Sequence, residues 1–264
     1  MTTVWIGPAG AMREVRSPAP MQVSYGRHHH VSRLLSGTHT IQIPPGAPRR
    51  WSWEMSWATR EELAYLTELE AGLHGGEYYW YDPMALESNM LSAAASMPGT
   101  EPQLGWSPID GASSAVVAAP GVLEVDGTAW SSLVPLLPGR TYTAAVENVD
   151  ASASVDLMLA RLDAAGDVIQ VDGPASASAG QRAVLTVTVP ESTNGASQQL
   201  MLLSPTAPCL VSRPQLTETD SAVDWLPGMG IPRVVVSGVS EIYQMAVAGL
   251  PTRSDWSAQL IEVG

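Results

Sequence analysis

Histidine, cysteine and carboxylate side chains build most catalytic and metal sites, and this chain has few of them at a useful spacing. His28, His29 and His30 are consecutive. On a strand, neighbouring side chains point to opposite faces, so only His28 and His30 could share a metal ion. His39 and His74 have no cysteine or histidine at ligand spacing. We therefore expect no metal site, and we interpret the histidine run as a strand or loop that faces a neighbouring subunit.

Catalytic signatures are absent from the sequence. It contains no H-E-x-x-H, G-x-S-x-G, P-loop or G-x-G-x-x-G motif. The single cysteine, Cys209, lies in an apolar run and is typical of a small buried side chain. The acidic segment 163–167 has the aspartate and glycine content of a tight turn and lacks the acidic ladder of a calcium loop. We predict a protein that is not an enzyme and has no cofactor.

Three tryptophans at short spacing form a second candidate site. Trp51, Trp53 and Trp57 follow Arg49 and Arg50. One interpretation is a subunit-contact or sugar-stacking face, since flat aromatic rings give a large contact area at low entropic cost. The other, which we favour, is a strand whose tryptophan-bearing face lines the core.

Two further tryptophans are candidates for glycan contact. Trp106 follows Gly105 and precedes a Ser-Pro pair, which favours exposure at a strand edge. Trp130 is separated from Val125 by an odd number of positions, so it alternates out of the core if no bulge intervenes. We predict that glycan, if bound, contacts Trp106 and Trp130.

Composition limits the partners. The chain of 264 residues has 26 acidic residues against 13 basic ones, all arginine, for a net charge of −13. This charge makes sequence-specific nucleic-acid binding implausible. Hydrophobic residues make up 45%, enough for a sizeable core, and we expect neither a membrane span nor a secretory signal. Phenylalanine is absent, so the aromatic core must use tryptophan and tyrosine.

The elements that must position these residues are mostly strands. Short segments of period-two alternation are separated by turn signals, which is typical of a sandwich or barrel. One helix is expected after Thr59, which forms a capping-box pattern with Glu62. Leucines at 63, 66, 69 and 73 then fall on one side of that helix.

The middle of the chain differs from its ends. Residues 91–220 are rich in Ala, Ser, Val, Leu and Gly, whereas most arginines lie outside them. The last 44 residues form too few strands for a sheet of their own. We predict a discontinuous domain of residues 1–90 and 221–264, with residues 91–220 as an inserted domain.

Several segments resemble minor tail proteins of long-tailed, siphovirus-type phages of actinobacteria, which are related to distal tail proteins. Residues 76–83 and 89–91 carry this resemblance at the front, and residues 232–236 and 257–263 carry it at the end. Residues 134–143, 163–169 and 214–218 are similar to carbohydrate-binding or galactose-binding jelly rolls. The resemblance implies a mainly β fold: a tail-ring β-barrel or sandwich domain with one short helix, and an inserted jelly-roll sandwich.

The resemblance also implies a function. It predicts a structural component of the phage tail tip, a homo-oligomeric ring that joins the tail tube to the tip or baseplate and lets DNA pass. Its partners would be other tail proteins, with no membrane, and its location would be the virion after synthesis in the host cytoplasm. The alternative is a module that binds host-surface glycan during adsorption. A tail-associated cell-wall hydrolase is a third hypothesis, since any fold can bring two carboxylates together.

Overall fold

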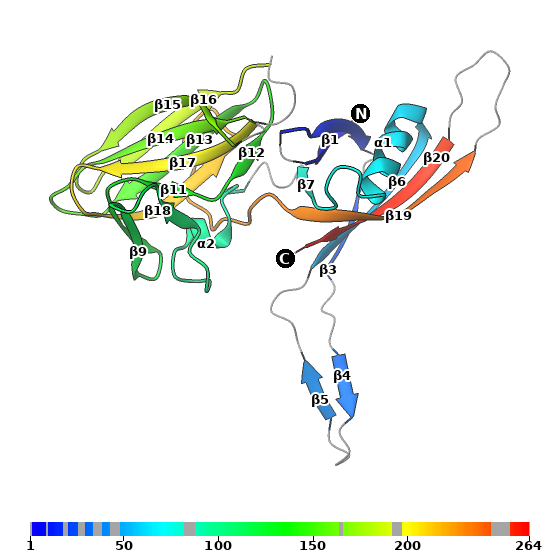
Figure 1. Ribbon diagram of the computed structural model, residues 1–264, viewed down its shortest axis with the longest axis horizontal. Helices are drawn as coiled ribbons and strands as arrows, with labels where there is room; N and C mark the ends of the chain where they lie inside the picture. Colours follow the sequence, from blue (N-terminus) through cyan, green and yellow to red (C-terminus); the bar gives the residue numbers. More distant parts are fainter. Residues whose placement is uncertain are drawn as a thin grey trace. The chain divides into compact units, whose positions relative to one another are not determined.

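The computed structural model describes residues 2–8, 10–17, 21–25, 30–33, 39–42, 48–81, 88–163, 166–191, 197–243 and 254–263. They form two compact units, which we describe separately (Figure 1). The first unit comprises residues 1–8, 14–80 and 232–264, and the second comprises residues 9–13 and 81–231. The boundaries between the two units thus lie near residues 80 and 231, whereas the sequence predicted them at residues 90 and 220. That the two units fold independently stays a prediction.

The first unit is built on one seven-stranded sheet. Its strands are ordered β2 (Arg13–Ser17), β1 (Thr2–Gly7), β7 (Tyr78–Tyr81), β19 (Arg233–Tyr243), β20 (Ser254–Glu262), β6 (Arg49–Ala58) and β3 (Gln22–Tyr25). The C-terminal strands β19 and β20 therefore lie between N-terminal strands. Two further strands, β4 (His30–Arg33) and β5 (His39–Gln42), pair only with each other among the described residues.

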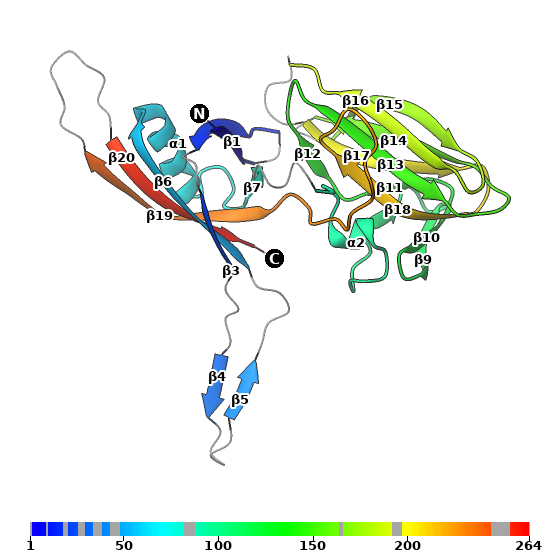
Figure 2. The same cartoon turned by 180° about the vertical axis from the view of Figure 1, so that it is seen from behind.

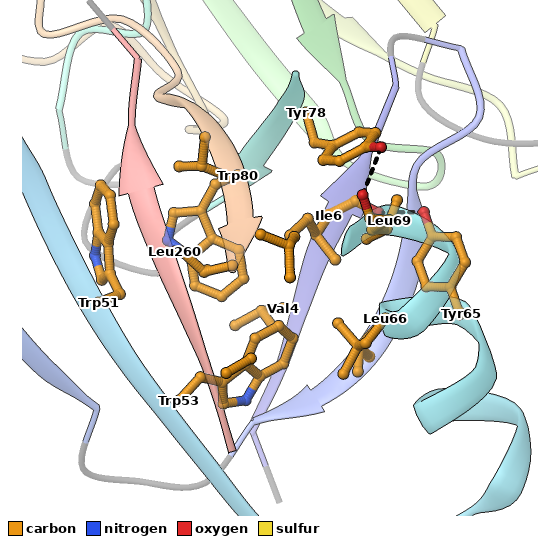
Figure 3. Packing of buried hydrophobic residues seen from close by; sticks show 14 of the residues in the cluster. Val4, Ile6, Trp51, Trp53, Tyr65, Leu66, Leu69, Tyr78, Trp80 and Leu260 are labelled. Carbon is orange, nitrogen blue, oxygen red and sulfur yellow. Dashed lines mark hydrogen bonds between the residues drawn. The ribbon is translucent and has the colours of Figure 1, made fainter. Parts of the chain in front are cut away.

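The helix α1 (Arg60–Glu70) covers one face of this sheet (Figure 3). Its predicted capping box is confirmed: the Thr59 side chain accepts from the Glu62 amide, and Glu62 accepts from the Thr59 amide at 2.8 Å. Tyr65 donates to the Ile6 carbonyl at 2.8 Å, which ties the helix to β1. Leu73 was expected on the buried side but is 71% exposed, because the helix ends at Glu70 and Gly72 turns the chain with a φ of +71°.

The second unit is an antiparallel sandwich of two sheets. Figure 2 shows it from behind, with β15 and β16 along the same edge. One sheet has the order β16 (Arg182–Thr188), β13 (Thr141–Asn148), β18 (Cys209–Thr217), β10 (Val122–Asp126) and β9 (Ser114–Ala119). The other has the order β15 (Val168–Ala177), β14 (Val155–Leu162), β17 (Ser197–Pro205), β11 (Ala129–Ser131) and β8 (Trp106–Pro108), and β12 (Val134–Leu136) pairs with β17.

Apolar side chains from both sheets fill the space between them. Leu123, Val125, Tyr142 and others from the five-stranded sheet face Leu157, Leu159 and Leu203 of the six-stranded sheet, and all of these are fully buried. A short helix, α2 (Ala93–Ser96), precedes the first strand of the sandwich. The predicted fold class, mainly β with a sandwich, is confirmed.

Asn89 joins the chain segments that enter and leave the sandwich. Its buried amide nitrogen donates to the carbonyls of Pro214 and Leu226, both at 3.0 Å. Its amide oxygen accepts from the Leu91 and Leu216 main-chain amides at 3.2 and 3.0 Å. The Asn89 side chain thus uses its full hydrogen-bonding capacity, and it joins residues 89–91 to residues 214–216 and to Leu226, which lie more than 120 residues further along the chain.

Replacement of Asn89 by alanine should destabilise the second unit strongly. The buried Leu91 and Leu216 amides and the part-buried Leu226 carbonyl would lose their partner, whereas the Pro214 carbonyl keeps the Trp225 Nε1 donor. Each buried group left unsatisfied costs about 1–3 kcal/mol. We expect a loss of about 3 kcal/mol or more in the free energy of unfolding, measured by urea denaturation. Gln103→Ala, at an exposed position of the same unit, is the control. A loss below about 1 kcal/mol for Asn89→Ala would contradict this role.

The attachment of α1 should weaken in acid. Arg16 Nε donates to Glu62 Oε1 at 2.6 Å, and this hydrogen bond lowers the pKa of Glu62 from 4.5 to about 2, with a smaller contribution from Thr59. Because the folded-state pKa lies below the unfolded value, the stabilisation is present above pH 4.5 and is lost as the pH falls towards 2.

We therefore expect the melting temperature of the wild type to fall more steeply between pH 4.5 and pH 2 than that of Glu62→Gln. Glutamine at this position keeps the capping-box pattern but carries no titrating charge. Glu61→Gln, at the exposed neighbouring position, should behave like the wild type. Parallel pH profiles for the wild type and Glu62→Gln would refute the assignment.

Candidate functional site

Trp130 lies on the outer face of the six-stranded sheet. Its neighbours along β11, Ala129 and Ser131, are buried against the interior, so alternation turns Trp130 outwards. Across the strands it is directly opposite Ser107 on β8 and Leu202 on β17, and Leu202 is opposite Met158 on β14. We call Ser107, Trp130, Leu202 and Met158 the Trp130 row. Trp130 lies outside the core, as the sequence analysis expected, but not for the reason given there, because Val125 lies on β10 of the other sheet and strand alternation does not run from it to β11.

The indole of Trp130 is half-buried and keeps its polar atom available. Its Nε1 is not among the buried atoms that lack a partner, and within the described residues no protein group accepts from it. The ring therefore offers an apolar face together with a free hydrogen-bond donor, which is the combination that tryptophan contributes at binding surfaces.

A second row of side chains follows two positions along each strand. It consists of Thr128, Ser204, Asp156 and Ser176, which we call the hydroxyl row. The Thr128 and Ser204 hydroxyls are 3.2 Å apart, and the Ser176 hydroxyl donates to Asp156 Oδ1. Since residues two apart on a strand are about 7 Å apart, the hydroxyl row runs parallel to the Trp130 row at roughly that distance.

The chain itself covers the part of the outer face of the five-stranded sheet that β13 and β18 form. Residues 218–226, the covering segment, lie over β13 and β18 and accept hydrogen bonds from them. Thr143 donates to the Thr219 carbonyl at 2.8 Å, and Gln215 donates to the Asp224 carbonyl at 3.1 Å. As a result Thr143 is 1% and Gln215 2% exposed, although both point away from the sandwich interior. This part of the face offers a ligand little access, whereas Val116 on β9 and Val184 on β16 remain exposed.

The start of the covering segment is anchored by a partly buried carboxylate. Glu218 is 3.2 Å from the Arg140 guanidinium, and burial raises the pKa of this carboxyl group. Arg182 on β16 donates to the Val223 carbonyl at 3.1 Å. Arg140 thus holds the start of the segment and Arg182 holds its middle, while the Asn89 amide holds its end at Leu226.

Exposure of Trp106 was wrongly predicted. Trp106 is opposite Ser131, so it points into the sandwich, and it is 2% exposed. Its Nε1 donates to the Ala95 carbonyl of α2 at 2.8 Å. Gly105 allows this approach, because a Cβ atom there would lie 2.3 Å from the Ala95 nitrogen. Trp106 is therefore a core residue and has no surface to offer a glycan.

The subunit-contact interpretation of Trp51 and Trp53 is also wrong, and the core interpretation is correct. Both side chains are fully buried in the first unit, on the face of β6 that packs against α1 and β1 (Figure 3). Trp53 packs against Trp80 and Trp256, with ring centroids 5.2 and 4.9 Å apart. The side chain of Trp57 lies outside the described residues.

In the part of the chain that the structure describes, histidine and cysteine side chains form no reactive cluster. His28 and His29, and the side chains of His30 and His39, lie outside the described residues, while His74 is 3.0 Å from Glu68. Burial raises the pKa of Cys209 to about 11, and its thiol is 3.3 Å from the Asn148 amide oxygen, which indicates a structural side chain. Within the described ranges no group of three or more His, Cys, Asp or Glu residues could hold a metal ion.

A cavity of about 590 Å³ lies in the first unit between α1 and the facing ends of β19 and β20. Its described lining includes Arg60, Thr67, Glu68, Glu241 and Ser254, and none of the lining residues that the structure describes is aromatic. It lacks the stacking surface that the Trp130 row provides. Among the described residues no helix is both long and apolar enough to cross a membrane.

Comparison with known proteins gives weak likenesses of fold. No family model matches the chain, and no curated protein matches it. The CBM22-1 xylan-binding domain from Paenibacillus barcinonensis Xyn10C is 15% identical, with a TM-score of 0.33, over 50% of this chain and 94% of that domain. The CBM22-1-GH10 modules of Clostridium thermocellum xylanase Xyn10B are 16% identical, with a TM-score of 0.32, over 46% of this chain and 27% of that one.

A third solved structure is the enzymatically active domain of bacteriophage CBA120 tailspike protein 4. It is 11% identical, with a TM-score of 0.35, over 50% of this chain and 21% of that one. The match thus spans only about a quarter of the xylanase chain and a fifth of the tailspike chain. At these identities and TM-scores we draw nothing from the likenesses about ligand, partner or membership of a phage tail.

Proposed function

We propose that this protein binds carbohydrate through the outer face of the six-stranded sheet. The observation that carries the proposal is Trp130, a half-buried indole with a free N–H on a sheet face beside a row of hydroxyl and carboxylate groups. A sugar ring has apolar C–H faces and polar edges, so it needs an aromatic surface and convergent polar groups together. Here the two rows supply both.

The proposed binding is not coupled to hydrolysis. Glycoside hydrolysis ordinarily requires two carboxylates about 5–10 Å apart across the scissile bond. The Trp130 row and the hydroxyl row contain one carboxylate, that of Asp156. We therefore propose a binding module and keep the cell-wall hydrolase as a weaker alternative, which would need a second carboxylate on this face.

The role in a phage tail tip is a second proposal. The observation that favours it is the open face of the seven-stranded sheet, where Ser52, Glu54, Ser56 and Gln259 are exposed on the side away from α1. A broad exposed sheet face that no other part of the described first unit covers suits the packing of a neighbouring subunit. In this proposal the first unit forms a ring in the virion that contacts other tail proteins, and the sandwich is carried outside it.

Truncation of Trp130 should remove carbohydrate binding. In a glycan array followed by calorimetry on the full chain, Trp130→Ala should lose about 2 kcal/mol of binding energy, roughly thirtyfold in affinity. Trp130→Phe keeps a ring and should retain part of the affinity. Tyr79→Ala, at a half-buried aromatic residue of the first unit, is the control. Unchanged binding by Trp130→Ala, or no binding of the wild type to any carbohydrate, would reject the proposal.

Ring assembly should be visible for the purified protein. Mass photometry and negative-stain images are expected to give a closed ring, and Ser52→Arg should weaken it because a large charge would enter the packed sheet face. Gln103→Arg in the second unit serves as the control. A wild-type protein that stays monomeric at all concentrations would count against the tail-ring proposal.

A further inference from the structure

The two rows on the outer face run across the strands, and this gives the face a direction. From β11 to β15 the hydroxyl row crosses four strands, which at about 4.8 Å between neighbours is about 14 Å. Thr128 lies at one end and Ser176 at the other, with Ser204 and Asp156 between them. The row is longer than a single sugar ring.

Along β14, in contrast, the face is covered beyond Met158. Ala160 and Leu162 follow Met158 on the same face of β14, but they are 1% and 6% exposed. Towards the hydroxyl row the side chains are accessible: Asp156 and Ser204 are half-buried and Ser176 is exposed. A chain-like ligand that follows β14 would meet this covered end, whereas one that lies across the strands from Trp130 to the hydroxyl row meets Ser204, Asp156 and Ser176, which are half-buried or exposed.

The face also carries a charge that selects among ligands. Its two rows hold one carboxylate, Asp156, and no arginine. The nearby Arg161 points to the other side of the sheet, is 4% exposed and pairs with Asp172 at 3.3 Å. Ser176 occupies one oxygen of Asp156, and within the described residues the other oxygen has no partner. That oxygen can accept a hydrogen bond from a sugar hydroxyl and repels an anionic group.

We infer that this face binds a neutral, linear oligosaccharide that lies across the strands, with Asp156 as the residue that determines specificity. This inference rests on the carbohydrate binding proposed above. One ring stacks on Trp130, and the following rings place their hydroxyls against Ser204, Asp156 and Ser176. The net charge of −13 acts in the same direction as Asp156, since it disfavours anionic ligands over the whole surface.

The experiment uses the full chain and hexasaccharides of known charge. The neutral probes are the hexasaccharides of cellulose, xylan, mannan and β-1,3-glucan, together with arabinogalactan, and the anionic probe is hexagalacturonate. Calorimetry gives the affinity ratio of neutral to anionic probes for the wild type, Asp156→Asn and Glu124→Gln. The last variant removes a carboxylate from the outer face of the other sheet and is the matched control.

The wild type should prefer a neutral probe, and Asp156→Asn should lower that preference roughly fivefold, since two charges about 4 Å apart interact by about 1 kcal/mol in water. Glu124→Gln should leave it unchanged. Ser176→Ala should lower the affinity for the hexasaccharide but not for the disaccharide of the same sugar, because a short ligand stacked on Trp130 does not reach β15. Asparagine accepts the Ser176 hydrogen bond as aspartate does, so Asp156→Asn should fold normally.

Three results would overturn the inference, and they differ from one another. If Trp130→Ala abolishes binding but Asp156→Asn leaves the preference unchanged, the specificity role is wrong and carbohydrate binding stands. If Ser176→Ala weakens disaccharide and hexasaccharide equally, the direction across the strands is wrong. If the wild type binds none of the neutral probes, carbohydrate binding fails and the inference fails with it.

Discussion

The four hydrogen bonds of the Asn89 side chain are the constraint on which the arrangement of the sandwich depends. They hold the entering segment, β18 and the Leu226 carbonyl together. Leu226 ends the covering segment, so the same amide keeps residues 218–226 across the five-stranded sheet. Gly228 then passes so close to the entering chain that a Cβ atom would lie 2.1 Å from the Leu91 carbonyl oxygen. The covering segment also carries Trp225, which is half-buried and donates to the Pro214 carbonyl, whereas the N–H of Trp130 on the other sheet has no protein acceptor among the described residues.

The absence of phenylalanine shapes both units, because each buried ring carries a polar atom. Tyr65, Tyr78 and Trp106 donate to main-chain carbonyls, which offsets the cost of their burial. In the tryptophan core of the first unit, Nε1 of Trp53, Trp80 and Trp256 has no partner among the described residues, and contacts between the rings must offset that cost. Trp130 differs from all of these, since its N–H is left for a ligand.

Local patterns were enough to predict the elements but not what covers them. The capping box at Thr59 follows from spacing alone, and the structure confirms it. The outward direction of Trp130 does not follow from its spacing to Val125, because Val125 lies on β10 of the other sheet. Trp106 was wrongly predicted to be exposed because it is covered by α2, and this helix of four residues is too short to leave a periodic signal in the sequence. The covering segment was equally hidden, since its bonds join Thr143 to Thr219 and Arg182 to Val223, pairs that are distant in the sequence. The sequence did not single out Asp156 as a site residue, because Asp156 comes to lie beside Ser176 and Ser204 only when β14 pairs with β15 and β17.

The central claim is that ligand meets the protein at Trp130 and not on the other sheet. Nine tryptophans give nine indole N–H signals in a nitrogen-15 NMR spectrum, and a titration with the best neutral hexasaccharide reports on each of them separately. We predict that the Trp130 signal shifts in a saturable way while the signals of the buried Trp106 and of Trp225, in the covering segment, stay in place. A saturable shift of Trp225 with Trp130 unmoved would place the ligand on the five-stranded sheet and contradict the account.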